Sequence, residues 1–145
     1  MSREAIYSAL FTLAQTITWG DGKTFINPSR RVRTFSEIKE WPTMAQAEHT
    51  ENVVPVTNMP SRTTLGAVWL LYHNAGKDKS ATPATESNAI LDAVEAMFPT
   101  DDSMGALQTL GGLVHRVAIT GSILKEHGDL DGQALLIVPL QIFVP

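Results

Sequence analysis

HGDLDGQALLIVPLQIFV, residues 127–144, contains the clearest indication of the fold. Its first six residues are mostly glycine and aspartate, which tolerate positive φ angles or bond their own backbone, as a hairpin loop requires. In the strand that follows, apolar side chains alternate along one face, at Leu136, Val138, Leu140, Ile142 and Val144. We therefore expect a long β-hairpin over Gln108 to Pro145 that turns at His127 to Gly132.

The two strands of this hairpin differ on their second faces. In the first strand, Arg116, Thr120 and Ser122 form a wetter face, which indicates a half-buried strand. They alternate with Leu113, His115, Val117, Ile119 and Ile123. The last strand is apolar on its second face too, at Leu135, Ile137 and Phe143. Because Pro139 has no N–H to donate, we expect the last strand at a sheet edge or a bulge.

Apolar residues at helical spacing predict two amphipathic helices. The first is marked by Ile6, Leu10, Leu13 and Ile17, and residues 20–22 end it. The second is marked by Ile90, Leu91, Val94, Met97 and Phe98, and Pro99 closes it. Thr85 or Ser87 is expected to cap its start. A capping-box pattern at residues 34–37, Thr-Phe-Ser-Glu, predicts a further short helix that ends before Pro42.

Residues 65–74 are apolar on both alternating faces, which is typical of a strand in the middle of a sheet. Thr43 to His49 is expected to be extended. Between these segments, Thr50 to Arg62 contains two prolines and two asparagines, so we interpret it as a long excursion beyond the sheet. Such an excursion is a natural place for contacts, and Val53, Val54, Pro55 and Val56 are candidate interface residues within it.

These elements predict an α/β fold of the α+β kind, in one domain over residues 1–145. Its core would be a mainly antiparallel sheet of four to five strands, with two helices packed on one face. Two helices cover only one face of a small sheet, yet the last strand is apolar on both faces. A large exposed apolar patch is unusual on a soluble monomer, so we expect a neighbouring subunit to cover the remainder.

Composition excludes several function classes. The chain has a formal net charge of -4 and no cysteine, so it lacks a broad basic field, a disulfide framework, a thiolate zinc site and a thiol nucleophile. No uninterrupted apolar stretch approaches the roughly 20 residues that span a bilayer. The expectation is a soluble product made inside the cell.

Motifs for catalysis or metal binding are weak. Gly22-Lys23-Thr24 ends like a phosphate-binding loop but lacks its first glycine and its preceding strand. Asp129 and Asp131 lie near a glycine, but the other ligands of a calcium loop are missing, so a turn is favoured. The four histidines show no paired ligand spacing. We expect no catalytic residue, no cofactor and no metal.

Three arginines, Arg30, Arg31 and Arg33, form a small basic cluster. Guanidinium groups bind carboxylates and phosphates bidentately, so the cluster is a candidate contact with another chain, while a plain exposed turn is the simpler interpretation. In the hairpin turn, His127, Asp129 and Asp131 are the further interface candidates.

The last third of the chain resembles the tail terminator, or tail-completion, proteins of long-tailed bacteriophages. The resemblance rests on Gln108-Thr109-Leu110-Gly111-Gly112-Leu113-Val114, Gly121, Gly128-Asp129-Leu130-Asp131-Gly132-Gln133-Ala134, Pro139 and Phe143-Val144-Pro145. Weaker similarity extends over the opening helix, the Ser29-Arg30-Arg31 neighbourhood, residues 41–51 and residues 62–76.

This resemblance implies a hexameric ring at the head-proximal end of the tail tube, within the virion. The ring would stop tube polymerisation, bind the tail tube protein on one side and the head–tail connector protein on the other, and leave a channel through which genomic DNA passes without specific binding. The protein would be made in the host cytoplasm.

Three other functions stay open. A head–tail connector or head-completion protein also forms rings without an active site. A small hydrolase-type enzyme would use His49 or His115 with nearby carboxylates, such as Glu48 and Glu51, in a deep polar pocket. A monomeric binding module would have a mass near 15.8 kDa in solution.

Overall fold

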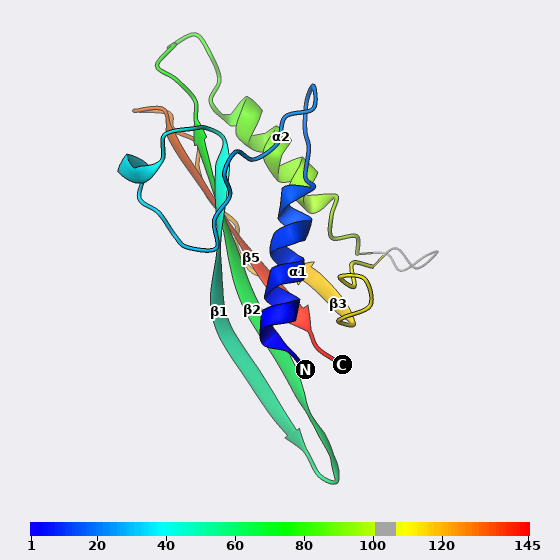
Figure 1. Cartoon of the computed structure of the whole chain (residues 1–145). Helices are drawn as coiled ribbons and strands as arrows, with labels where there is room; N and C mark the ends of the chain where they lie inside the picture. The colour runs from blue at the N-terminus through cyan, green and yellow to red at the C-terminus, as the bar shows by residue number, and fades with distance from the viewer. Residues whose placement is uncertain (101–106) are drawn as a thin grey trace.

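Figure 1 shows a computed structural model of the chain, which describes residues 1–100 and 107–145. The helices are α1 (Arg3–Gln15), the short 3₁₀ helix η1 (Phe35–Glu37) and α2 (Ala84–Glu95). The strands are β1 (Thr43–Val56), β2 (Met59–Asn74), β3 (Arg116–Ile119), β4 (Leu124–Glu126) and β5 (Gln133–Phe143). The pairings between these strands are antiparallel, in the order β1-β2-β5-β3, and β4 also pairs with β5. The expected α+β fold is confirmed.

Both α-helices pack on the same face of the sheet, as expected. Leu10 of α1 and Val94 of α2 are fully buried in one apolar cluster with Trp69 of β2. A buried polar chain also fixes α1: the Trp69 indole donates to Gln46 Oε1 at 2.9 Å, and the Gln46 amide donates to the Tyr7 carbonyl at 2.9 Å. These two hydrogen bonds give the Trp69 indole and the Gln46 amide their partners in the core, and they fix the position of α1 on the sheet.

The segment that contains η1 covers one end of the opposite face. Ile38 packs there against Ala45 and Tyr72, with Phe35 and Trp41 beside them. The Tyr72 hydroxyl donates to the Arg33 carbonyl at 2.7 Å. The capping box over residues 34–37 is present, so the predicted short helix is confirmed in its 3₁₀ form.

The rest of that face has no such cover. Val68, Ile137 and Pro139 lie on it and stay partly exposed, and they belong to neither apolar cluster. We call the part of the sheet around these three residues the uncovered face.

The predicted hairpin over Gln108 to Pro145 is right in its turn and its second strand but wrong in its first strand. Residues 127–132 connect β4 to β5, as expected. The first strand, however, begins at Arg116 and breaks between Ile119 and Leu124. Positive φ angles explain both limits: Leu110, Gly111 and Gly112 turn at 53°, 71° and 93°, and Gly121 turns at 89° inside the break.

Pro139 was expected to place β5 at a sheet edge or a bulge. The edge is wrong, because β5 lies between β2 and the β3 and β4 pair, and the pairing of β5 with β2 runs through Pro139 without a bulge. Thr120 N donates to the Pro139 carbonyl at 3.2 Å, which places the Pro139 backbone groups on the β3 side. The N and O of one strand residue point the same way. The proline nitrogen therefore faces the break between β3 and β4, where no ladder bond is lost.

Two further expectations need correction. Thr50 to Arg62 does extend beyond the rest of the sheet, as expected, but it is a two-stranded ribbon of β1 and β2 and not a loop, with Thr57 and Asn58 at the turn. Helix α2 begins at Ala84 and has no side-chain cap, so neither Thr85 nor Ser87 caps it. Pro83 already has a helical φ of -57°, so the helix starts before Thr85. Thr85 therefore lies inside the first turn and not at the cap position.

Candidate interaction surfaces

The β1–β2 ribbon extends beyond the rest of the sheet. Strand β5 ends at Phe143, opposite Thr64, so beyond Thr64 the strands β1 and β2 pair only with each other, with Val53 opposite Thr63 and Val54 opposite Arg62. We call residues 52–61 the arm, and Figure 1 shows it at the bottom of the view, past both chain ends. The arm contains no charged residue.

Apolar side chains are exposed on the arm. Val53, Val54 and Met59 have exposed fractions of 53%, 48% and 66%. Pro55 is exposed, and Val56 is partly buried at the turn. The four predicted interface residues 53–56 thus lie together on the arm, while Met59 was not among the sequence candidates. Its position is set by the hairpin turn, in a segment that the sequence pattern had indicated to be a loop.

A β-bulge sets the root of the arm. His49 and Thr50 together face the single residue Gly66 in the pairing of β1 with β2. A Cβ at Gly66 would lie 2.9 Å from the Thr50 carbonyl oxygen, so the two strands come this close only because residue 66 is glycine. The Glu51 carboxylate, just beyond the bulge, accepts from Arg3 Nε at 2.5 Å and from a terminal nitrogen at 2.9 Å. These contacts tie the start of α1 to the arm.

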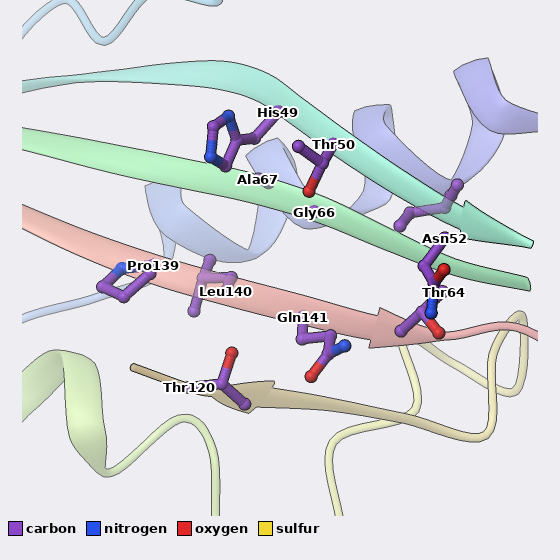
Figure 2. A pocket seen from close by; sticks show the side chains of 11 residues that line it. His49, Thr50, Asn52, Thr64, Gly66, Ala67, Thr120, Pro139, Leu140 and Gln141 are labelled. Atoms are coloured by element: carbon purple, nitrogen blue, oxygen red, sulfur yellow. The ribbon is translucent and has the colours of Figure 1, made fainter. Parts of the chain in front are cut away.

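A hollow of about 230 Å³ lies on the uncovered face at the root of the arm. Figure 2 shows its side chains in front of the sheet, with helix ribbon behind. The hollow is lined by His49, Thr50, Asn52, Thr64, Leu65, Gly66, Ala67, Thr120, Pro139, Leu140 and Gln141. None of these is an aspartate, glutamate, lysine or arginine, so the surface is polar but carries no fixed charge.

The polar side chains of the hollow are available to a partner. Those of Asn52, Thr120 and Gln141 make no hydrogen bond with another described residue, and the same holds for His49, Thr50 and Thr64. Hydroxyls and amides of this kind both donate and accept, which suits recognition of a polypeptide backbone or of other uncharged groups.

The turn over residues 127–132 lies at the opposite end of β5 from the arm. Gly132 N donates to the Gly128 carbonyl at 2.9 Å, and the Asp131 carboxylate accepts from Gln133 N at 2.9 Å. Asp131 therefore stabilises its own turn, as the turn interpretation expected. Asp129 is exposed, His127 is partly buried, and Leu130, which was not among the sequence candidates, is fully exposed at 100%.

The three arginines of the basic cluster have different surroundings. Arg30 is engaged within the chain, in ion pairs with Glu4 and with Glu48. Its guanidinium holds the pKa of the Glu4 carboxyl below the ordinary value, mainly through the hydrogen bond between them. Arg33 donates to the Thr43 hydroxyl at 3.0 Å. Arg31 is exposed, and its side chain makes no hydrogen bond or ion pair with another described residue, which makes it the arginine best placed to reach another chain.

The four histidines lie on different parts of the chain, two on strands and two outside them. His49 is on β1 and His115 directly precedes β3, and β2 and β5 separate these strands. No carboxylate is among the described residues that line the hollow around His49. Across the described part of the chain, no three His, Asp or Glu side chains form a group that could hold a metal ion.

A second polar cluster lies at the other end of the sheet. The Glu86 carboxylate accepts from the Trp19 indole at 2.9 Å and from Lys23 Nζ at 3.2 Å, and these contacts lower its pKa, the Trp19 bond most. Lys23, the middle residue of the Gly22-Lys23-Thr24 turn, is thus paired with Glu86 within the chain. An open depression at this end of the sheet is lined by Lys23, His73 and Glu86. Burial lowers the pKa of the His73 imidazole.

None of the described helices has the length and apolar composition needed to cross a bilayer. No protein-family model matches the chain, and no curated protein matches it in sequence. The functional proposal therefore rests on three surfaces and on the motifs of the last third of the chain. The surfaces are the arm, the uncovered face and the turn over residues 127–132.

Proposed function

We propose that this chain is a structural virion protein that caps the head-proximal end of a phage tail tube. As a ring, it stops tube polymerisation and joins the tail to the head connector. Its partners are further copies of itself, the tail tube protein and the connector protein. Genomic DNA passes through the channel of the ring without specific binding.

The observation that supports this proposal most is the one-sided cover of the sheet. Both α-helices pack on one face, while the uncovered face and the arm carry partly exposed apolar side chains. Burying a fully exposed side chain of this kind contributes on the order of 1.5–3 kcal/mol, and these partly exposed side chains contribute a fraction of that each, so together they favour an assembled state. The resemblance of residues 108–145 to tail terminators supplies the kind of assembly.

The two candidate contact segments also lie at opposite ends of the molecule. Asn58 is at the turn of the arm, and Asn74 pairs with Gln133 beside the other turn. At about 3.3 Å per residue, Asn58 and Asn74 are roughly 50 Å apart. A protein that joins two different partners needs two separate surfaces, and this arrangement provides them.

Termination requires no reaction. One face of the ring would match the last ring of tail tube protein and bind it. The other face would not be complementary to tube protein, so further tube subunits could not add. We assign one contact to the arm and another to the turn over residues 127–132, whose exposed Leu130 lies between two aspartates. Arg31 is assigned to a contact between neighbouring copies.

Deletion of residues 53–60 tests the assignment of the arm. Ser61, Arg62 and Thr63 would then connect Asn52 to its pairing partner Thr64, so the core is expected to stay folded and the circular dichroism spectrum to lose only the strand signal of the arm. Infectious tails are expected to fall sharply in yield, because docking to tube or connector is lost. Substitution of the exposed Thr18 by alanine, outside both contact segments, serves as the control. Completed tails at normal yield from the deletion variant would refute the assignment.

A head–tail connector or head-completion ring is the alternative within the same class. Imaging particles that carry a labelled copy separates the two functions. A terminator is located at the top of the tail tube, also on tails that have no head attached, whereas a connector stays with the head.

A further inference from the structure

We propose that the arm of one copy lies across the uncovered face of the next copy, with its tip in the hollow at the root of that copy's own arm. This inference rests on the proposed function, because it describes how neighbouring copies in the ring hold one another. It adds the two surfaces that meet and the chemistry by which they do so.

The arm requires a cover that its own chain does not supply. Val53 pairs opposite Thr63 and Val54 opposite Arg62, so the two valines point to opposite faces of the ribbon. Each is about half exposed. The ribbon is the direct continuation of β1 and β2, and the hollow lies at its own root, so the tip reaches a hollow only on another copy.

Uncharged surface on both sides points to a second copy as the partner. The chain carries a net charge of -4, so two copies repel each other wherever their charged surfaces meet. Residues 52–61 contain no charged residue, and the charges directly beside them on the ribbon are Glu51, which is paired with Arg3, and the exposed cation Arg62, opposite Val54. The lining of the hollow contains no aspartate, glutamate, lysine or arginine. Like charges across an interface cost several kcal/mol, and pairing these two surfaces avoids that cost.

The chemical character of the two surfaces also matches. The arm offers valine and methionine side chains with a Thr-Asn turn at its tip. The uncovered face offers apolar Val68, Ile137 and Pro139 beside the polar hollow. The two surfaces are also similar in length. The strand of the arm spans residues 52–56, the facing stretch of β5 spans residues 137–141, and five strand residues extend about 17 Å.

Such a contact is heterologous, because it joins different surfaces of the two copies. Each copy gives one arm and receives one, and this head-to-tail pattern closes into a ring when the rotation between copies is right. Pro55 lies in the edge strand of the arm and cannot donate a backbone hydrogen bond. It limits continuous strand addition at that edge, so side chains are the main contacts.

Disulfide cross-linking tests the contact cleanly, since the chain has no cysteine of its own. One copy carries Thr57→Cys at the tip of the arm, and a differently tagged copy carries Thr120→Cys in the lining of the hollow. Two other receiving positions serve as comparisons. They are Thr12→Cys on the exposed surface of α1, and Leu113→Cys, 45% exposed, beside an apolar groove near the N-terminus. The mixtures are oxidised mildly at the concentration where rings form.

We expect cross-linked dimers from the 57 and 120 pair at least tenfold above those from the 57 and 12 pair. Rings of the expected mass without this cross-link, or with an equal cross-link to position 12 or 113, would overturn the inference and leave the proposed function standing. Failure of the wild-type protein to form rings, alone or on tail tubes, would overturn both.

A charge placed in the interface gives a second readout. Val53→Lys on the arm is expected to abolish ring formation while the melting temperature of the free protein changes little, because Val53 is 53% exposed and its cross-strand partner Thr63 is uncharged. Thr18→Lys adds the same charge outside the contact and is expected to leave rings intact. Rings of normal mass from Val53→Lys would contradict the contact.

Discussion

Gly132 occupies a position in the turn before β5 that has no room for a side chain. Its φ is +79°, and a Cβ there would lie 2.5 Å from the Gly76 carbonyl oxygen. Ala75 N also donates to the Gly132 carbonyl at 2.8 Å, so the turn and the residues that follow β2 are packed together. The sequence predicted that a turn lies here, but this close approach depends on residues 56 positions apart in the chain.

Gly132→Ala is therefore expected to destabilise the protein by about 2 kcal/mol or more. The left-handed conformation alone costs an L residue roughly 1–2 kcal/mol, and the backbone contact adds to this. Gly22→Ala is the matched control, because Gly22 has a φ of +82° but a Cβ added there would meet no atom within 4 Å. Urea unfolding of both variants measures the difference, and equal losses would show that the contact with Gly76 is unimportant.

His73 gives the protein a defined dependence of stability on pH. Burial lowers the pKa of His73 in the folded protein, with a smaller lowering by Lys23 and an opposing effect of Glu86. The unfolded chain binds a proton at about pH 6.5, while the folded chain does so only at lower pH. The contribution to stability from a neutral, partly buried His73 is therefore fully present above pH 6.5. It is lost as the pH falls from 6.5 toward the lower pKa of His73 in the folded protein.

We expect the free energy of unfolding to decrease between pH 7.5 and pH 5.5, and His73→Gln to reduce that decrease. Carboxylates do not interfere, because their ordinary pKa values lie near 4. Chemical unfolding at several pH values measures the effect. An identical pH profile in His73→Gln would contradict the role given to this side chain.

At the scale of elements, the ribbon shows what sequence patterns predict and what they miss. The strand over residues 65–74 and the final strand were predictable, because their apolar alternation is continuous. The strand character of Thr50 to Arg62 was not, because prolines and asparagines are usually signs of loops. Pro55 is tolerated in an edge strand, and Pro139 is tolerated in β5 because its nitrogen faces a break. Both facts depend on pairing partners far away in the chain.

The bulge at the root of the arm depends on Gly66. Gly66→Ala is expected to cost about 1–3 kcal/mol, because the added methyl group would lie 2.9 Å from the Thr50 carbonyl oxygen and the strands must separate. Faster hydrogen exchange is expected at Asn52 and Val53. Thr50→Ala, which removes the hydroxyl but keeps the carbonyl, should have little effect and should not rescue Gly66→Ala. Rescue by Thr50→Ala would mean that the side chain, and not the backbone, is the obstacle.

At the scale of the whole molecule, the apolar second face of the last strand predicted the uncovered face. The arm residues 53–56 were also identified from the sequence, though as part of a loop. Leu130, Met59 and the hollow were missed, because exposure at a turn tip and the meeting of three strands are set by the fold. Sequence proximity also made Arg30, Arg31 and Arg33 look equivalent, although the fold engages two of them within the chain.

The mass of the purified protein in solution, measured by light scattering and supported by images of the same sample, tests the central claim most directly. A ring gives a mass that is a multiple of 15.8 kDa, six-fold for a hexamer, and images of closed rings with a central channel. The measurement is made at high concentration and again after addition of tail tubes. A uniform monomer that forms no ring under either condition would contradict the claim that this chain caps a tail tube.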